Sequence, residues 1–223
     1  MFTQETLDFL AENCFMGSRE WFNSHKKDYI SHVKEPLTDF CLRLGPEAAE
    51  IDPLLVTDPK TATSRIFRDM RFVRGGSPYR DVQWVSFRRE REAYSGWPEF
   101  FFVFSPREFF YGTGYYSASA GAMETVRELI KSSDPAFRKA QAALEAHPEI
   151  QIGGDLYKRS RHMEYTEPLR AWLDRKNLRF VVQPGDVTEL FAKDLAQKVS
   201  AAWRAMAPVY EFLMRAEKAA RKL

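Results

Sequence analysis

Five arginines gather in one short stretch of the chain, between Ser64 and Asp81. They are Arg65, Arg68, Arg71, Arg74 and Arg80. A guanidinium group offers five donors in a fixed fork and keeps its charge, so such a cluster must meet carboxylates, phosphates or carbonyl oxygens. The stretch therefore predicts a pocket for a small anionic ligand that carries a phosphate or a carboxylate.

A second basic cluster, Lys158-Arg159-Ser160-Arg161-His162, follows a Gly-Gly turn and Tyr157. If this segment folds over the first cluster, the two would form one deep anion pocket, with Tyr79, Trp84 and Tyr157 as flat apolar walls. Asp69 is expected to orient an arginine rather than to act as a general base, and no catalytic residue or reaction is predicted. The residues expected to bind the ligand are Arg65, Arg68, Asp69, Arg71, Tyr79, Arg80, Lys158 and Arg159.

Two other classes of function stay open. Tyr79, Trp84 and Trp97 stand near arginines and could stack the bases of a single-stranded nucleic acid. A net charge of +2 and the acidic residues between positions 90 and 99 argue against the continuous basic groove that this function needs. In the other class the arginines are architectural: they pair with some of the 31 acidic residues, and the protein is an interaction module.

Metal and cofactor signatures are weak in this sequence. His25 and His32 lie seven residues apart, which on a straight helix separates them by about 10 Å along the axis, too far for both to bind one zinc. Gly112 and Gly114 lack the third glycine of a dinucleotide fingerprint, and a bend after a strand is their expected role. We expect no metal and no cofactor.

Length and composition favour one α+β domain over residues 1–223. The chain has a mass of 26.0 kDa, 44% hydrophobic residues and no break in composition. Acidic residues interrupt the N-terminal segment, no apolar run is long enough to span a membrane, and the two cysteines are isolated. These features predict a cytoplasmic protein without a membrane partner, and they leave its oligomeric state open.

Periodicity and capping signals predict helices at both ends of the chain and strands between them. Helices are expected over 3–13, 19–34, 37–44 (ended by Gly45-Pro46), 122–131, 135–146, 166–175 and from a cap at Asp186 onward. Strands are expected over 65–72, from 79, and over 82–88, 100–104, 108–111 and 178–182, with a Gly75–Pro78 turn. The fold predicted is a mostly antiparallel central sheet, packed by the N-terminal helices and a long C-terminal helix.

The segment Arg-Ile-Phe-Arg-Asp-Met-Arg-Phe at 65–72, followed by Ser-Pro-Tyr-Arg at 77–80, resembles the signature of a widespread bacterial and fungal family of conserved proteins of unknown function. The resemblance extends to residues 19–22, 111–114 and 207–208. The chain departs from the family pattern in its Arg-Gly-Gly spacer at 74–76, and it lacks a Pro-Arg-Gly element near 158–162. The resemblance implies a compact α+β domain, and it brings no established activity, cofactor or catalytic residue.

Overall fold

A six-stranded antiparallel sheet with the order β1-β2-β3-β4-β6-β5 forms the centre of the structure. The computed structural model describes residues 1–72 and 75–223. The strands are β1 (Leu55–Val56), β2 (Gln83–Arg89), β3 (Glu99–Phe104), β4 (Phe109–Gly114), β5 (Gln151–Gly153) and β6 (Arg179–Val182). Each strand pairs with its neighbours in antiparallel register, so the predicted α+β fold with an antiparallel sheet is confirmed.

Helices precede and follow these strands. Before β2 come α1 (Gln4–Met16), α2 (Arg19–Ser24), α3 (Lys26–Asp28), the π-helix η1 (Tyr29–Lys34), α4 (Glu35–Ile51), α5 (Pro59–Ala62) and the 3₁₀ turn η2 (Met70–Phe72). After β2 come α6 (Arg91–Tyr94), α7 (Ala120–Lys131), α8 (Pro135–Ala146), α9 (Glu167–Leu173), the 3₁₀ turn η3 (Val187–Phe191) and the long α10 (Leu195–Arg221). No helix within these residues is long and apolar enough to cross a membrane.

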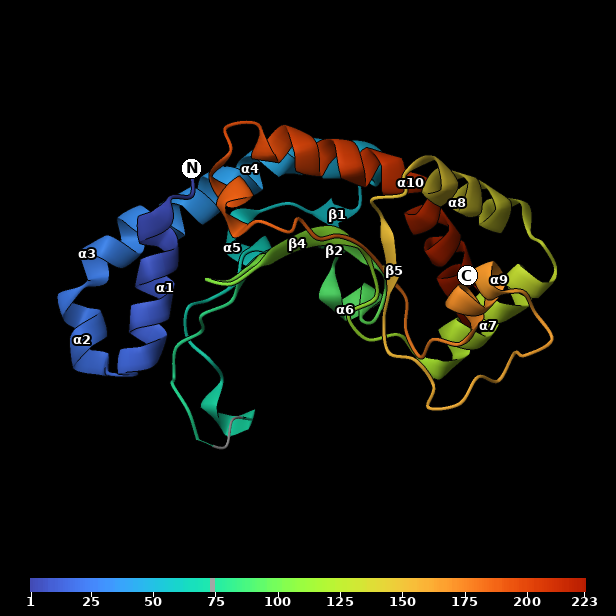
Figure 1. Ribbon diagram of the computed structural model, residues 1–223, viewed down its shortest axis with the longest axis horizontal. Coiled ribbons are helices and arrows are strands. Elements are labelled where there is room, and N and C mark those ends of the chain that lie inside the picture. The colour runs from blue at the N-terminus through green and yellow to red at the C-terminus, as the bar shows by residue number, and fades with distance from the viewer. Residues whose placement is uncertain (73–74) are drawn as a thin grey trace.

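One face of the sheet is covered by α4 and α10, which lie along the top of the arched sheet in Figure 1. Alternate residues of β3 point to this face, because successive side chains of a strand point to opposite sides. The Phe100 ring lies 5.4 Å from that of Trp203 on α10, and the Phe102 ring lies 4.5 Å from that of Phe40 on α4. These fully or nearly fully buried aromatic side chains make the main contact between the sheet and its helices.

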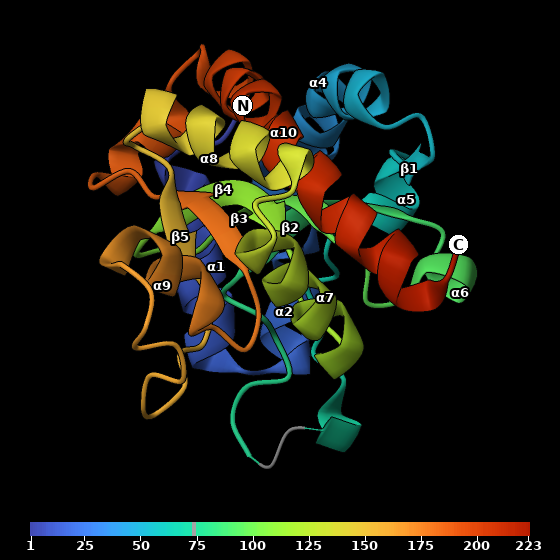
Figure 2. The ribbon, with the colours of Figure 1, turned by 90° about the vertical axis from the view of Figure 1, so that its right-hand side faces the viewer.

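The opposite face of the sheet is not covered by either of these helices. In Figure 1, α1, α2 and α3 extend downward at one end of the sheet, and α7 and α9 stand at the other end. Residues 64–72 and 75–82, between α5 and β2, extend beneath the sheet in Figure 1, and the view turned by 90° in Figure 2 shows them again below the body of the molecule. We call this uncovered side the open face.

Three predicted helix boundaries were wrong. Gly45-Pro46 does not end a helix, since α4 continues to Ile51. Pro46 has no amide N–H to donate to the carbonyl of Leu42, but Leu42 is exposed, so water can bind that carbonyl. The expected helix over 19–34 is divided into α2, α3 and η1. The Asp186 side chain caps η3 by accepting a hydrogen bond from the Thr188 amide, and α10 begins only at Leu195.

Gly112 and Gly114 lie within β4 and not in the bend that the sequence predicted. A Cβ atom at Gly112 would lie 1.8 Å from the carbonyl oxygen of Phe180, and one at Gly114 would lie 2.4 Å from that of Leu178. Gly114 also has a φ of +139°, which side chains rarely adopt. The two glycines therefore let the backbones of β4 and β6 approach each other closely.

We expect Gly112→Ala to lower the free energy of unfolding by about 3 kcal/mol or more, because a backbone atom would have to move to admit the methyl group. Gly121→Ala is the matched control, since Gly121 lies in α7 with open space around its Cα and should change stability by at most about 1 kcal/mol. Urea denaturation of both variants measures the difference. Equal stability of the two variants would contradict the close approach of β4 and β6.

Candidate functional site

Residues 64–72 and 75–82, which we call the arginine arm, form an irregular pair of segments and not the two predicted strands. The Arg68 amide donates to the Pro78 carbonyl, the Arg80 amide donates to the Ile66 carbonyl, and a single β-bridge joins Phe67 to Tyr79. Beyond Arg68 the chain turns into η2. The predicted turn does contain two glycines with positive φ, at +78° and +85°. Arg74 lies outside the described residues.

Two arginines of the arm form ion pairs within it. Arg68 Nη2 lies 3.1 Å from Asp81 Oδ1, and Arg71 binds both oxygens of Asp69, at 2.9 and 2.6 Å. The hydrogen bonds from Arg71 lower the pKa of Asp69 to about 2. Because the side chains of Asp69 and Arg71 are 42% and 81% exposed, water screens the pair and it adds little stability.

Tyr79 belongs to the core and not to the wall of a pocket. It is 1% exposed, and its ring lies 5.0 Å from Phe22 and 5.3 Å from Phe67. These contacts attach the arginine arm to α2. The expected role of Tyr79 as an apolar wall for a ligand is therefore corrected, because packing against Phe22 uses its ring.

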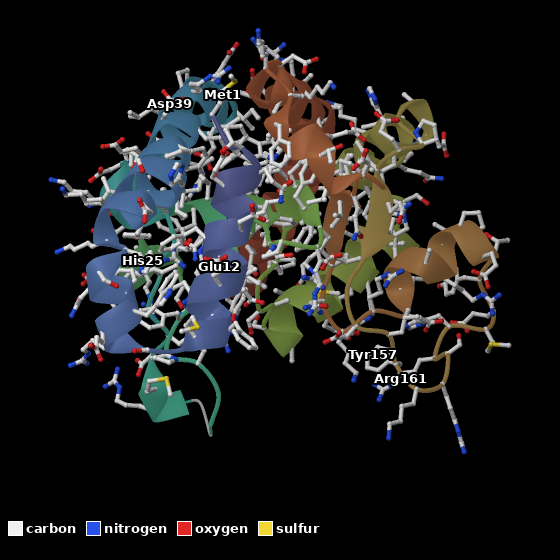
Figure 3. All side chains as sticks on the ribbon, turned by 60° about the vertical axis from the view of Figure 1, so that its left-hand side comes forward. Met1, Glu12, His25, Asp39, Tyr157 and Arg161 are labelled. Carbon is white, nitrogen blue, oxygen red and sulfur yellow. The ribbon has the colours of Figure 1, made fainter. Side chains whose placement is uncertain are left out.

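The two basic clusters are not brought together. The loop between β5 and α9 carries Lys158 and Arg159, and it stands apart from the arginine arm in all three views (Figures 1, 2 and 3). Its own contacts hold it in place: the Arg161 guanidinium stacks 4.0 Å from the Tyr157 ring, and the Ser160 hydroxyl donates to Asp174 at 2.5 Å. Figure 3 shows Tyr157 and Arg161 on this loop, far from the helices that carry Glu12 and His25. The single deep pocket that the sequence suggested is not present between these segments.

A different pocket lies on the open face of the sheet, with a volume of about 410 Å³. We call it the open-sheet pocket. Its apolar wall is formed by Trp84, Phe101, Val103, Phe110 and Tyr116. Its polar groups come from Arg80, Ser86, Arg88, Glu99 and Arg179. Of the residues predicted to bind a ligand, only Arg80 lines this pocket.

A wider depression of about 1110 Å³ lies beside the open-sheet pocket and shares four lining residues with it. The shared residues are Arg80, Trp84, Ser86 and Arg88. The wider depression also includes the predicted residues Arg65, Arg68 and Asp69. The arginine arm therefore borders the open face, and Arg80 is the residue through which it reaches both hollows.

Strand periodicity and register position the side chains of the open-sheet pocket. Trp84, Ser86 and Arg88 are alternate residues of β2, so they share one face. Ser86 pairs with Phe101 of β3, and Glu99 lies two residues before Phe101 on the same face. Across β4, Glu99 pairs with Gly114, which in turn pairs with Arg179 of β6. Because Gly114 has no side chain, none stands between Glu99 and Arg179 in this row.

Three arginines reach the pocket from three separate segments. Arg88 comes from β2, Arg179 from β6 and Arg80 from the arginine arm. Arg80 is held by its Nε, which donates to the Phe67 carbonyl at 3.2 Å, and its guanidinium lies 5.0 Å from the Trp84 ring. None of the three forms an ion pair with a carboxylate within residues 1–72 and 75–223.

Glu99 is the buried acid of this pocket, and sequence reasoning did not select it. It is 9% exposed, and the Ser86 hydroxyl donates to its Oε2 at 2.6 Å. Burial raises the pKa of Glu99, although the hydrogen bond from Ser86 and the charge of Arg88 oppose the rise. A sequence signal was available, because Glu99 begins a strand whose other residues are Phe-Phe-Phe-Val-Phe and shares the face of Phe101 and Val103.

The arrangement combines cationic donors, one buried carboxyl group and an aromatic wall. Guanidinium groups bind carboxylates or phosphates, and the Glu99 carboxyl can accept or donate one further hydrogen bond. In the described part of the chain, no group of three or more His, Cys, Asp or Glu side chains is placed to hold a metal ion. These residues therefore offer donors that suit an anionic group and one carboxyl group beside them.

We expect the stability of the Glu99→Gln variant relative to the natural protein to rise with pH. The pKa of Glu99 is raised in the folded state, so below the ordinary value of 4.5 the carboxyl group is neutral in both states and has no charge penalty. As the pH rises through the folded-state pKa, the natural protein must ionise a buried group, and its free energy of unfolding falls. The Gln variant has no group to ionise at this position and does not lose this stability. Chemical denaturation of both proteins at pH 4 and pH 7 measures this difference, and a Gln variant whose stability relative to the natural protein falls as the pH rises would contradict it.

Comparison with curated proteins finds no match. The model of a family described as conserved hypothetical protein (DUF2461) matches residues 5–212, which is most of the chain, and this agrees with the expected membership of a conserved family of unknown function. The chain belongs to the DUF2461 family of conserved hypothetical proteins.

Proposed function

We propose that the protein binds a small organic anion in the open-sheet pocket. The observation that carries this proposal is the convergence of Arg80, Arg88 and Arg179, from three segments, on a pocket where no carboxylate of the described residues pairs with them. Like charges repel, so a fold gains no stability from gathering three unpaired guanidinium groups. Sites of this kind trade stability for the binding of a ligand.

The shape and lining of the pocket support a ligand of limited size with an apolar portion. A volume of about 410 Å³ lies at the small end of the range for small-molecule sites. Trp84, Phe110 and Tyr116 supply flat surfaces beside the arginines, and Tyr116 is 87% exposed. An anionic group bound by the arginines would therefore be joined to an aromatic or other apolar group that contacts these rings.

The residues proposed to bind the ligand differ from those predicted from the sequence alone. Arg80 belongs to both sets of residues. Arg65 and Arg68 line the wider depression, which Arg80 also lines. Arg71 pairs with Asp69, and the loop with Lys158 stands apart. Arg88 and Arg179 join Arg80 as the proposed ligand-binding arginines, because both line the open-sheet pocket.

A single-stranded nucleic acid is the competing ligand class, since Trp84 lies between two hollows that both contain arginines. The wider depression also contains Asp69, Glu90 and Glu92, whose charges would repel a phosphate backbone. We therefore favour the small anion. Gel retardation of single-stranded DNA at low salt, lost steeply as salt is added, would instead support the nucleic-acid class.

We expect Arg88→Ala and Arg179→Ala each to weaken binding of 3-phenylpropionate at least about ten-fold, the effect of losing one hydrogen bond to a charged group. Both variants should stay folded, because neither side chain forms an ion pair within the described residues; Arg88→Ala loses the charge that opposes the raised pKa of Glu99, so Arg179→Ala should be the more stable of the two. Isothermal titration calorimetry measures the affinity, and thermal denaturation measures the stability.

Arg138→Ala serves as the matched control, because Arg138 is an exposed arginine on α8, a helix that packs against α10 on the other side of the molecule from the open face. This variant should bind 3-phenylpropionate as the natural protein does. If Arg88→Ala and Arg179→Ala unfold the protein, or if all three variants bind equally, the arginines have an architectural role and the proposal is wrong.

A further inference from the structure

The open-sheet pocket contains a carboxyl group among its arginines, which is unusual for an anion site and restricts the ligand. Glu99 lies on the same face as Ser86 and Phe101, and it is 9% exposed. An anion bound by Arg88 and Arg179 would lie close to this group and be repelled by it when it is ionised. A ligand that carries only an anionic group is therefore poorly matched to the pocket.

The hydrogen bonds of Glu99 are incomplete in the protein itself. The Ser86 hydroxyl donates to Oε2 at 2.6 Å, and Oε1 accepts no hydrogen bond from any residue in 1–72 and 75–223. An ionised carboxylate accepts several hydrogen bonds, and Oε1 is not among the fully buried atoms that lack a partner, so it is open to the pocket. A donor that enters the pocket with the ligand would satisfy the second oxygen.

The other titratable and charged groups around Glu99 do not supply that donor. Arg88 lies on the neighbouring strand and acts on Glu99 through its charge, and Arg179 lies beyond Gly114 on β6. Tyr115 donates its hydroxyl to the Leu213 carbonyl at 3.3 Å, so its proton is directed into the core. Arg80 Nε donates to the Phe67 carbonyl, its guanidinium lies 5.0 Å from the Trp84 ring, and no hydrogen bond joins it to Glu99 among the described residues.

We infer that Glu99 determines specificity, and that the pocket takes an organic anion that carries an ammonium or hydroxyl group beside its anionic group. This inference rests on the proposed function. The arginines bind the anionic group, Glu99 accepts from the ammonium or hydroxyl group, and the aromatic wall contacts the remainder. A site built to accept a hydrogen bond rejects the analogue that lacks the donor, because its buried acceptor is then left unpaired.

Three matched probes test this selection: L-phenylalanine, L-3-phenyllactate and 3-phenylpropionate. They share a phenyl ring, a carboxylate and the same chain length, and they differ only in carrying an ammonium, a hydroxyl or a hydrogen on the carbon next to the carboxylate. We expect at least one of the first two to bind the natural protein about ten-fold or more tightly than 3-phenylpropionate at pH 7, as measured by isothermal titration calorimetry.

Glu99→Gln should reduce this discrimination to about three-fold or less, with tighter binding of 3-phenylpropionate as the negative charge is lost. Gln keeps a carbonyl oxygen for Ser86, so the pocket should hold its shape, and circular dichroism checks the fold. Glu128→Gln is the control, because it removes an exposed carboxylate from α7 outside the pocket and should leave the discrimination unchanged.

The outcomes distinguish failure of this inference from failure of the proposed function. Equal binding of all three probes by the natural protein, or unchanged discrimination in Glu99→Gln, overturns the selectivity while leaving anion binding in place. Binding of none of the probes at 10 mM overturns both. If Arg88→Ala weakens the binding and Glu99→Gln makes it less selective, the results support both the proposed function and this inference.

Discussion

The structure depends on the burial of one face of a strongly aromatic sheet. Alternate residues of β3 must point to opposite sides, so the contacts of Phe100 and Phe102 with α10 and α4 also determine which residues point away from those helices. A slip of one residue in register would bury Glu99 against α10 and expose the phenylalanines. The register that forms the core is thus the same register that places Glu99, Ser86 and Arg88 on the open face.

The site also depends on contacts between segments that are distant in the chain. The close approach of β4 and β6 at Gly112 and Gly114 brings Arg179 into the same row as Glu99. The packing of Tyr79 on Phe22 anchors the arginine arm to α2, and the hydrogen bond from Arg80 to the Phe67 carbonyl orients its guanidinium toward Trp84. The glycine pair positions Arg179 through the backbone of β6, and the buried Tyr79 positions Arg80, its neighbour in the chain.

Stability and recognition make opposite demands on the two faces. On the covered face, the buried Asp52 is matched by Arg89 at 2.8 Å and by the Tyr210 hydroxyl at 2.5 Å, whereas the buried Trp203 Nε1 on α10 has no hydrogen-bond partner among the described residues. On the open face, Glu99 has one donor, and the three arginines have no carboxylate partner among the described residues. The fold thus leaves hydrogen-bonding capacity unused where a ligand can reach it, at some cost in stability.

The sequence by itself determined the fold class, most strands and helices, and the fact that this protein concentrates arginine. Those features depend on local periodicity, caps and turns, which are set by the residues of each segment and not by its contacts with the rest of the chain. The sequence led to Arg65–Arg80 as the site because those arginines are neighbours in the chain. Only the tertiary structure decided that Arg68 and Arg71 pair locally, that Tyr79 is buried, and that Arg80 joins Arg88, Glu99 and Arg179. These residues are separated by up to about a hundred positions, and it is the pairing register of the sheet that makes them neighbours in space.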